Sequence, residues 1–81
     1  MKLKVRFFSA YRNITGVDEM TAEKPPGTTV GELFEDIVKI YPSLKKFKTA
    51  AMFAVNREFA DPDQILRDGD EVAFMPPVGG G

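Results

Sequence analysis

The feature that most constrains this chain is one amphipathic helix, predicted over residues 29–41. Apolar residues recur there at the spacing i, i+3, i+4, i+7, i+8 and i+11, which lines one face of a helix of about three turns. These residues are Val30, Leu33, Phe34, Ile37, Val38 and Tyr41. Thr29 and Glu32 have the spacing of a capping box, and Pro42 favours the end of the helix at Tyr41. A helix that is apolar on one side must be covered on that side, and the flanking segments indicate a sheet.

Five short segments around the helix are predicted to be strands: 2–8, 17–23, 51–56, 59–60 and 71–75. Two strands, a helix and three further strands predict an α+β fold, with the helix packed on one face of a mixed sheet. The first and last strands are expected to be adjacent and parallel at its centre. This arrangement is the β-grasp, or ubiquitin-like, fold. We expect it to occupy residues 1–77, with residues 78–81 as a flexible C-terminal glycine tail.

Alternation within the strands predicts which side chains face the core. Leu3, Val5 and Phe7 share one face of the first strand, which leaves Phe8 on the opposite face. Met75 falls on that same opposite face in the last strand.

The connections between the strands carry their own signals. A short helical turn is expected over 9–16 and should end at Gly16 in a left-handed cap. Residues 56–58 and 68–70 are typical of tight turns. Ile65 and Leu66 are expected to form a small apolar anchor.

Composition narrows the classes of function. The chain has 81 residues, enough for one domain, and contains no Cys and no His. It therefore lacks a disulfide, a thiolate nucleophile and the usual near-neutral acid–base group. We expect no permanently bound cofactor, no metal, and no catalysis by this chain alone.

Charge and hydropathy indicate where the protein acts. The net charge of −1 argues against a nucleic-acid binder, and the basic residues Lys45, Lys46 and Lys48 are interpreted as a solvated helix end. No apolar run approaches the ~20 residues needed to span a bilayer, and no signal-peptide pattern opens the chain. We therefore expect a cytoplasmic protein without a membrane partner.

The C-terminus is the chemically distinctive segment, because Pro76 and Pro77 precede Val78 and three glycines. Proline favours an extended exit, and glycines add no side-chain width, so this end could enter a narrow channel in a partner. The carboxylate of Gly81 is an anion at neutral pH and must be activated, for example as an acyl-adenylate, before a sulfur or nitrogen nucleophile can attack it. Taken alone, such an end also fits a frayed or artificial terminus.

With these residues in view, the chain resembles the MoaD family, the small sulfur-carrying subunit of molybdopterin synthase. The resemblance rests on segments 5–8, 11–16, the helix from Thr29, 54–56 and, above all, the closing run 68–81. The family ends in a diglycine, matched by Gly80 and Gly81. Gly79 stands where the family lets the residue vary.

The resemblance implies a mechanism and partners. A ubiquitin-activating-type (E1-like) enzyme resembling MoeB would use ATP to adenylate Gly81, and a sulfur donor would convert it to a thiocarboxylate. A large subunit resembling MoaE would accept the tail, with Gly80 and Gly81 at the reacting end, and form molybdopterin in a heterotetramer. The family's partner-binding positions correspond here to Phe8, Phe59, Met75, Pro76, Pro77, Val78 and Gly79. Partial burial of the apolar residues under a loop is the alternative.

Three other functions stay open at this point. The chain could carry sulfur for thiamine synthesis or tRNA thiolation. It could be a ubiquitin-like modifier joined to lysines through Gly81. It could also be a β-grasp interaction module, such as a regulatory RNA-binding domain, whose tail is idle. A β-grasp ferredoxin is excluded, because its cluster needs cysteines.

Overall fold

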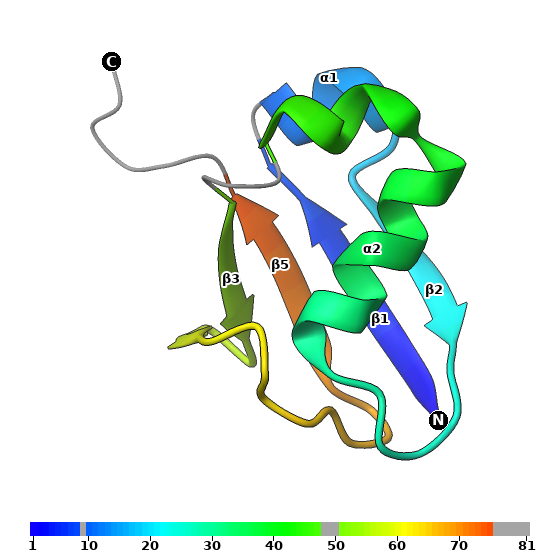
Figure 1. Ribbon diagram of the computed structural model, residues 1–81, viewed down its shortest axis with the longest axis vertical. Helices are drawn as coiled ribbons and strands as arrows, with labels where there is room; N and C mark the ends of the chain where they lie inside the picture. Colours follow the sequence, from blue (N-terminus) through cyan, green and yellow to red (C-terminus); the bar gives the residue numbers. More distant parts are fainter. Residues whose placement is uncertain (9, 48–50, 76–81) are drawn as a thin grey trace.

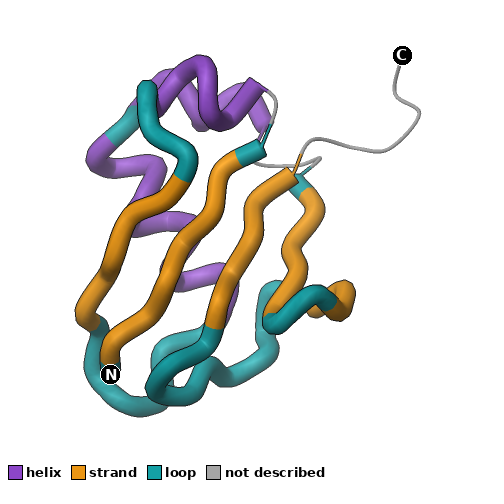
Figure 2. Tube along the Cα trace, turned by 180° about the vertical axis from the view of Figure 1, so that it is seen from behind, coloured by secondary structure: helices purple, strands orange, loops and turns teal. Residues whose placement is uncertain are grey.

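A computed structural model describes residues 1–8, 10–47 and 51–75 of the protein. The elements in chain order are β1 (Lys2–Phe7), α1 (Ala10–Thr15), β2 (Glu19–Glu23), α2 (Val30–Ile40), the 3₁₀ helix η1 (Pro42–Phe47), β3 (Met52–Val55), β4 (Glu58–Ala60) and β5 (Glu71–Met75). The sheet has the order β2-β1-β5-β3-β4, in which β1 and β5 are parallel and the other neighbours antiparallel. Helix α2 lies across one face (Figure 1), and no helix formed by the described residues lies on the opposite face (Figure 2). The predicted β-grasp fold is confirmed.

Helix α2 begins and ends where the sequence predicts. The Thr29 hydroxyl accepts a hydrogen bond from the Glu32 N–H at 3.2 Å, and the Glu32 carboxylate accepts one from the Thr29 N–H at 2.9 Å. This capping box is confirmed. The connection between β4 and β5 accepts two further N–H groups: Val30 donates to Gln64 at 2.9 Å and Gly31 to Pro62 at 2.8 Å. The first turn of α2 is thus held by its own cap and by a segment far along the chain.

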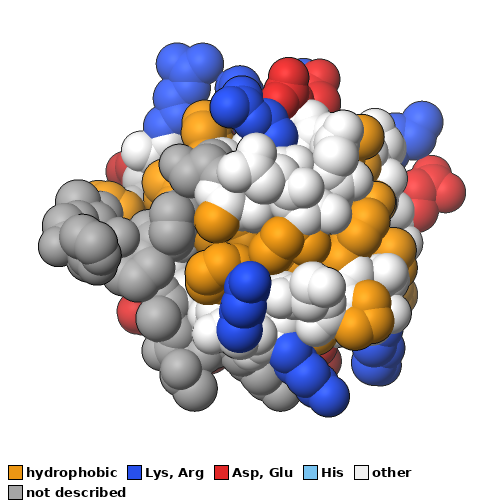
Figure 3. All heavy atoms as spheres, turned by 90° about the horizontal axis from the view of Figure 1, so that it is seen from above, with side chains coloured by type: hydrophobic (Ala, Val, Ile, Leu, Met, Phe, Trp, Pro, Cys, Tyr) orange, Lys and Arg blue, Asp and Glu red, His pale blue; other side chains and the backbone are white. Residues whose placement is uncertain are grey.

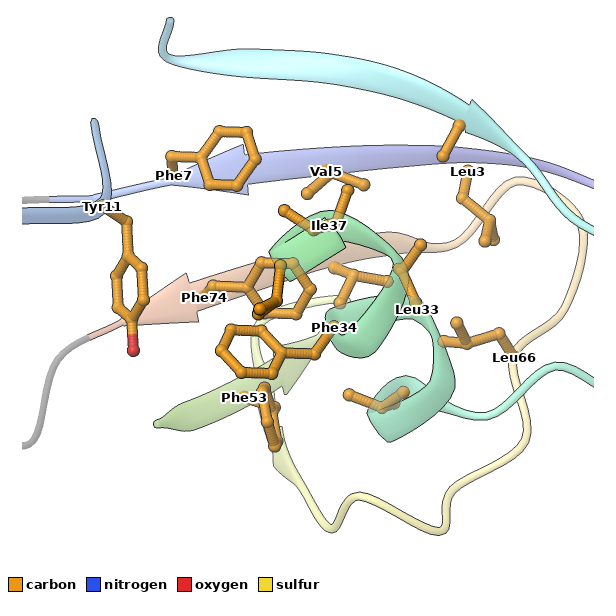
Figure 4. Close-up of a cluster of buried hydrophobic side chains, with 14 of the residues drawn as sticks. Leu3, Val5, Phe7, Tyr11, Leu33, Phe34, Ile37, Phe53, Leu66 and Phe74 are labelled. Carbon is orange, nitrogen blue, oxygen red and sulfur yellow. The ribbon is translucent and has the colours of Figure 1, made fainter. Parts of the chain in front are cut away.

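The core lies between α2 and the sheet, and Figure 4 shows its side chains converging from both layers. Phe34 of α2 is 2% exposed, and its ring centroid lies 5.1 Å from that of Phe74 and 5.3 Å from that of Phe53. Both pairs meet edge to face, the arrangement that aromatic rings favour. Tyr11 of α1 closes one end of this cluster, with its centroid 4.9 Å from that of Phe47.

The alternation predicted for β1 is confirmed, since Leu3, Val5 and Phe7 are all buried. Gly16 ends α1 with a φ of 78°, the predicted left-handed cap. The turn at 68–70 pins the start of β1 beside β5: the Lys2 N–H donates to the Asp68 carboxylate at 2.7 Å, and the Gly69 N–H donates to the Lys2 carbonyl at 2.8 Å.

Some local predictions need correction. Ile65 is 61% exposed while Leu66 is buried, so only one member of the predicted pair is an anchor. Ile65 forms an antiparallel bridge with Thr29, and neighbouring residues of an extended segment point to opposite sides. Strand β2 starts at Glu19 rather than at residue 17, because the Thr15 hydroxyl bonds to the Val17 backbone in a turn after α1.

The 3₁₀ helix η1, which contacts α2 and buries Leu44, was not predicted from the sequence. Lys45 and Lys46 of η1 are exposed, as expected for a solvated helix end, and Lys48 lies outside the described residues. The predicted boundary after Pro77 lies outside them as well. Within the described part of the chain, no helix is long and apolar enough to cross a membrane.

The capping box provides a test of the fold. We expect Thr29→Ala to lower the free energy of unfolding by about 1 kcal/mol, because the Glu32 N–H loses its acceptor. In thermal unfolding this corresponds to a fall in Tm of about 4–8 °C for a domain of this size. Thr29→Ser keeps the hydroxyl and should stay close to the unsubstituted protein. An equal loss in both variants would contradict a role for the cap.

Candidate functional site

A hollow of about 270 Å³ lies on the face of the sheet opposite α2. It is lined by Arg6, Phe8, Ala54, Arg57, Phe59, Glu71, Ala73 and Met75. Its shape follows from strand register: Ala54 of β3 pairs with Ala73 of β5, so two methyl groups stand side by side. Because side chains on one face of a sheet stand roughly perpendicular to it, small residues among large ones leave a depression.

Aromatic residues stand at two sides of the hollow. Phe59 of β4 pairs with Ala54 and is 73% exposed. Phe8 directly follows β1 and is 39% exposed. Met75, the last residue of β5, is half-buried. The structure therefore brings together the three described residues of the predicted partner face, Phe8, Phe59 and Met75.

The rim of the hollow is charged. The guanidinium of Arg6 lies 5.4 Å from the centroid of the Phe8 ring and 3.7 Å from the Glu71 carboxylate. A cation over an aromatic face is attracted by the ring quadrupole, so Arg6 helps to hold Phe8 in place. Arg6 thus covers part of the Phe8 ring, and the rest of the ring stays exposed and available for contact with another protein.

A tight turn positions the β4 side of the hollow. Asn56 and Arg57 have φ values of 51° and 72°, both in the left-handed region. The Asn56 side chain donates to the Asp70 carboxylate at 2.9 Å and accepts from the Glu71 N–H at 3.0 Å. These bonds tie the turn between β3 and β4 to the start of β5. They thereby place Phe59 beside the hollow.

Sequence reasoning missed five residues of the lining: Arg6, Ala54, Arg57, Glu71 and Ala73. Alternation places Arg6, Glu71 and Ala73 on the same face of their strands as Phe8 and Met75, but it does not reveal that Ala73 has Ala54 as its neighbour. The remaining predicted site residues, Pro76, Pro77, Val78, Gly79, Gly80 and Gly81, lie outside the described residues. The chain continues into them directly from Met75 at the hollow.

Acid–base features lie away from this face. Burial raises the pKa of Tyr11 to about 12. A hydrogen bond from the Lys24 ammonium, 2.7 Å away, lowers the pKa of Asp36. Among residues 1–8, 10–47 and 51–75, no group of His, Cys, Asp or Glu could hold a metal ion. The arrangement of the hollow, an apolar floor with a charged rim, suits recognition of a protein surface.

Hydrophobic side chains also reach the surface at the end of the molecule where α1 and η1 lie, with Lys and Arg side chains among them (Figure 3). One of the exposed hydrophobic residues near η1 is Ile40, the last residue of α2, which is 59% exposed. Single exposed apolar residues are common on protein surfaces, whereas a hollow with convergent aromatic walls is a better mark of an interface.

The family model and the related sequences that match this chain agree with one another. The model of the ThiS family matches residues 5–81. The molybdopterin synthase sulfur carrier subunit of Chlamydomonas reinhardtii is 37% identical, over the whole of both chains. The protein of the same name from Mycobacterium tuberculosis is 38% identical, over all of this chain and 99% of the relative.

Solved structures that are similar to this chain include proteins of the same kind as these relatives. A putative molybdopterin converting factor subunit 1 from Pyrococcus furiosus is 36% identical, with a TM-score of 0.81 over 95% of this chain and 98% of that one. In a protein–protein complex of subunits 1 and 2 of the molybdopterin-converting factor from Helicobacter pylori, one chain is 28% identical, with a TM-score of 0.70 and full coverage of both. A ubiquitin from Caldiarchaeum subterraneum, 18% identical with a TM-score of 0.65, covers 100% of this chain and 98% of that one and shares the fold.

Two phenylalanines on neighbouring strands test whether the open face is required for folding. Phe59→Ala should change the free energy of unfolding by no more than about 0.5 kcal/mol, since the side chain is mostly in solvent. Phe53→Ala should cost about 3–5 kcal/mol, because Phe53 is 8% exposed and packs on Phe34 and Phe74. Denaturant unfolding measures both. Similar losses would show that Phe59 belongs to the folding core.

Proposed function

Because the chain belongs to the ThiS family, we propose that it is the sulfur carrier subunit of a molybdopterin synthase. The observation that carries the proposal is the full-length identity of 37% and 38% with proteins of that name. It acts as a subunit and is not an enzyme by itself. We expect it to work in the cytoplasm, where ATP and its partner proteins are present.

The chemistry proposed for Gly81 has two steps. An E1-like enzyme, similar to MoeB, joins the carboxylate to the AMP portion of ATP and releases pyrophosphate. A sulfur nucleophile from a donor then attacks the acyl carbon, and the bond to AMP breaks, which leaves a thiocarboxylate. The activating enzyme consumes the ATP, so this chain needs no resident cofactor. Glycine at the terminus leaves the reacting carbonyl unhindered.

The large subunit is the proposed acceptor. Support comes from the solved complex of subunits 1 and 2 of the related converting factor. We infer that a MoaE-like subunit covers the hollow, takes up the tail and uses the sulfur to convert cyclic pyranopterin monophosphate to molybdopterin. Two copies of each subunit are expected in the assembly. The position of Met75, at the hollow and directly before the tail, fits one partner engaging both.

The carrier chemistry can be tested by intact-protein mass spectrometry. After incubation with a MoeB-type enzyme, ATP and a sulfide source, we expect one oxygen of the chain to be replaced by one sulfur. Removal of Gly81 should abolish the change, because the reacting carbonyl is then displaced by one residue. Gly79→Ala is the matched control, since it alters the tail and keeps the last two glycines.

No change in mass, with an activating enzyme proven on its own carrier, would contradict the proposal. Conjugates of Gly81 with lysines in cell extract would instead assign the chain to the modifiers. If sulfur is loaded but no molybdopterin forms with the large subunit and cyclic pyranopterin monophosphate, the chain serves another thiolation pathway.

The partner face gives a second test. We expect Phe8→Ala combined with Met75→Ala to leave the fold intact and to weaken binding of the large subunit by roughly tenfold or more. Isothermal titration calorimetry measures the affinity, and circular dichroism checks the fold. Ile40→Ala, which removes an exposed apolar side chain elsewhere, should bind normally. Unchanged affinity of the double variant would contradict a role for this face.

A further inference from the structure

Arg57 has a backbone conformation that does not suit it. It occupies the second central position of the tight turn between β3 and β4, with a φ of 72°. In such turns glycine is preferred there, because a Cβ atom crowds the neighbouring carbonyl in the left-handed region. Asn56, at the first position, is among the residues that tolerate this region. A glycine at position 57 would therefore adopt this turn conformation with less strain than the arginine.

The guanidinium of Arg57 is also without an ion-pair partner within the described residues. The two other charged groups of the lining, Arg6 and Glu71, lie 3.7 Å apart and offset each other. Arg57 is exposed and forms no ion pair with any residue in the described ranges. The hollow therefore has a positive rim on its β4 side, next to the exposed ring of Phe59.

The place of the hollow relative to the tail indicates what covers it. Met75 lines the hollow, and six residues follow it to Gly81, a span of at most about 22 Å. A protein that handles the Gly81 carboxylate through a narrow channel must therefore approach close to this face. To complement Arg57, that protein needs a negative charge opposite the guanidinium.

We propose that Arg57 is a specificity-determining anchor of this face, which binds an Asp or Glu carboxylate on the large subunit while an apolar side chain of that subunit fills the hollow. The inference rests on the proposed function and deepens it. A guanidinium suits this role because its planar fork can bind a carboxylate through two parallel hydrogen bonds, a geometry that the lysine ammonium does not offer. The turn then keeps an unfavourable residue because binding requires it.

The experiment compares substitutions that separate charge from backbone strain. Arg57→Gln keeps much of the length and the β-carbon but removes the charge. Arg57→Gly removes both the charge and the strain, and Arg57→Lys keeps the charge without the fork. Lys45→Gln, on η1 and outside the hollow, is the control for a general loss of positive charge. Stopped-flow and calorimetric binding to the large subunit are measured at ionic strengths of about 0.1 M and about 1 M, across which the Debye length falls from about 10 Å to about 3 Å.

We expect Arg57→Gln and Arg57→Gly to weaken binding by roughly two- to tenfold at the lower ionic strength and to reduce its salt dependence. Arg57→Lys should lie between them and the unsubstituted protein, and Lys45→Gln should bind normally. Arg57→Gly should also raise the Tm, by about 2–6 °C, because relief of the left-handed conformation outweighs the greater conformational entropy that glycine loses on folding. A more stable protein that binds less well is the combination that a purely structural arginine would not produce.

Normal binding by Arg57→Gln would overturn the proposal, as would an equal loss in Lys45→Gln. A shift of the tail glycine resonances in the NMR spectrum of free Arg57→Gln protein would assign the arginine to the chain's own carboxylate and overturn it too. Self-association that Arg57→Gln abolishes would assign the face to a second copy. If the unsubstituted chain does not bind the large subunit at all, the proposed function fails and this inference falls with it.

Discussion

The parallel pairing of β1 with β5 is the contact on which the rest of the structure depends. It joins the two ends of the chain, with Val5 opposite Val72 and Phe7 opposite Phe74, at the centre of the sheet. Both strands supply the floor on which α2 packs. Because parallel strands end at the same edge, Phe8, which follows β1, and Met75, the last residue of β5, lie at one edge of the sheet. The fold thereby places the exposed ring of Phe8 and Met75, the last described residue, at the same hollow.

The parts of the molecule that could be predicted are those whose signal lies within a single segment of the chain. The helix was predictable because its periodicity, capping box and terminating proline are local signals that tertiary contacts reinforce. The faces of β1 and β5 were predictable because a period of two assigns each residue to a side. Phe8 and Met75 could be placed on the open face for that reason alone.

The features that could not be predicted depend on contacts between segments that are distant in the sequence. The pairing of Ala54 with Ala73 creates the floor of the hollow, and no pattern within either strand reveals it. The conformation of Arg57 depends on how Asn56 bonds to the start of β5. Ile65 was assigned wrongly because a two-residue apolar run does not say which member faces inward. The 3₁₀ helix η1 follows a helix-ending proline, where a local pattern predicts only that α2 stops.

A sheet covered by one helix has a second face, which must be polar or be covered by something else. Here the covered face holds the aromatic cluster around Phe34, and stability is concentrated there. The other face has two alanines at its floor and aromatic side chains beside them, so it is not strongly polar. The ion pair of Arg6 with Glu71 and the charge of Arg57 keep its rim hydrated in the free protein. Since Met75, the last described residue, lies at the hollow, a partner bound to this face would also lie close to the start of the tail. The order of the strands therefore brings the open face and the start of the tail to the same place.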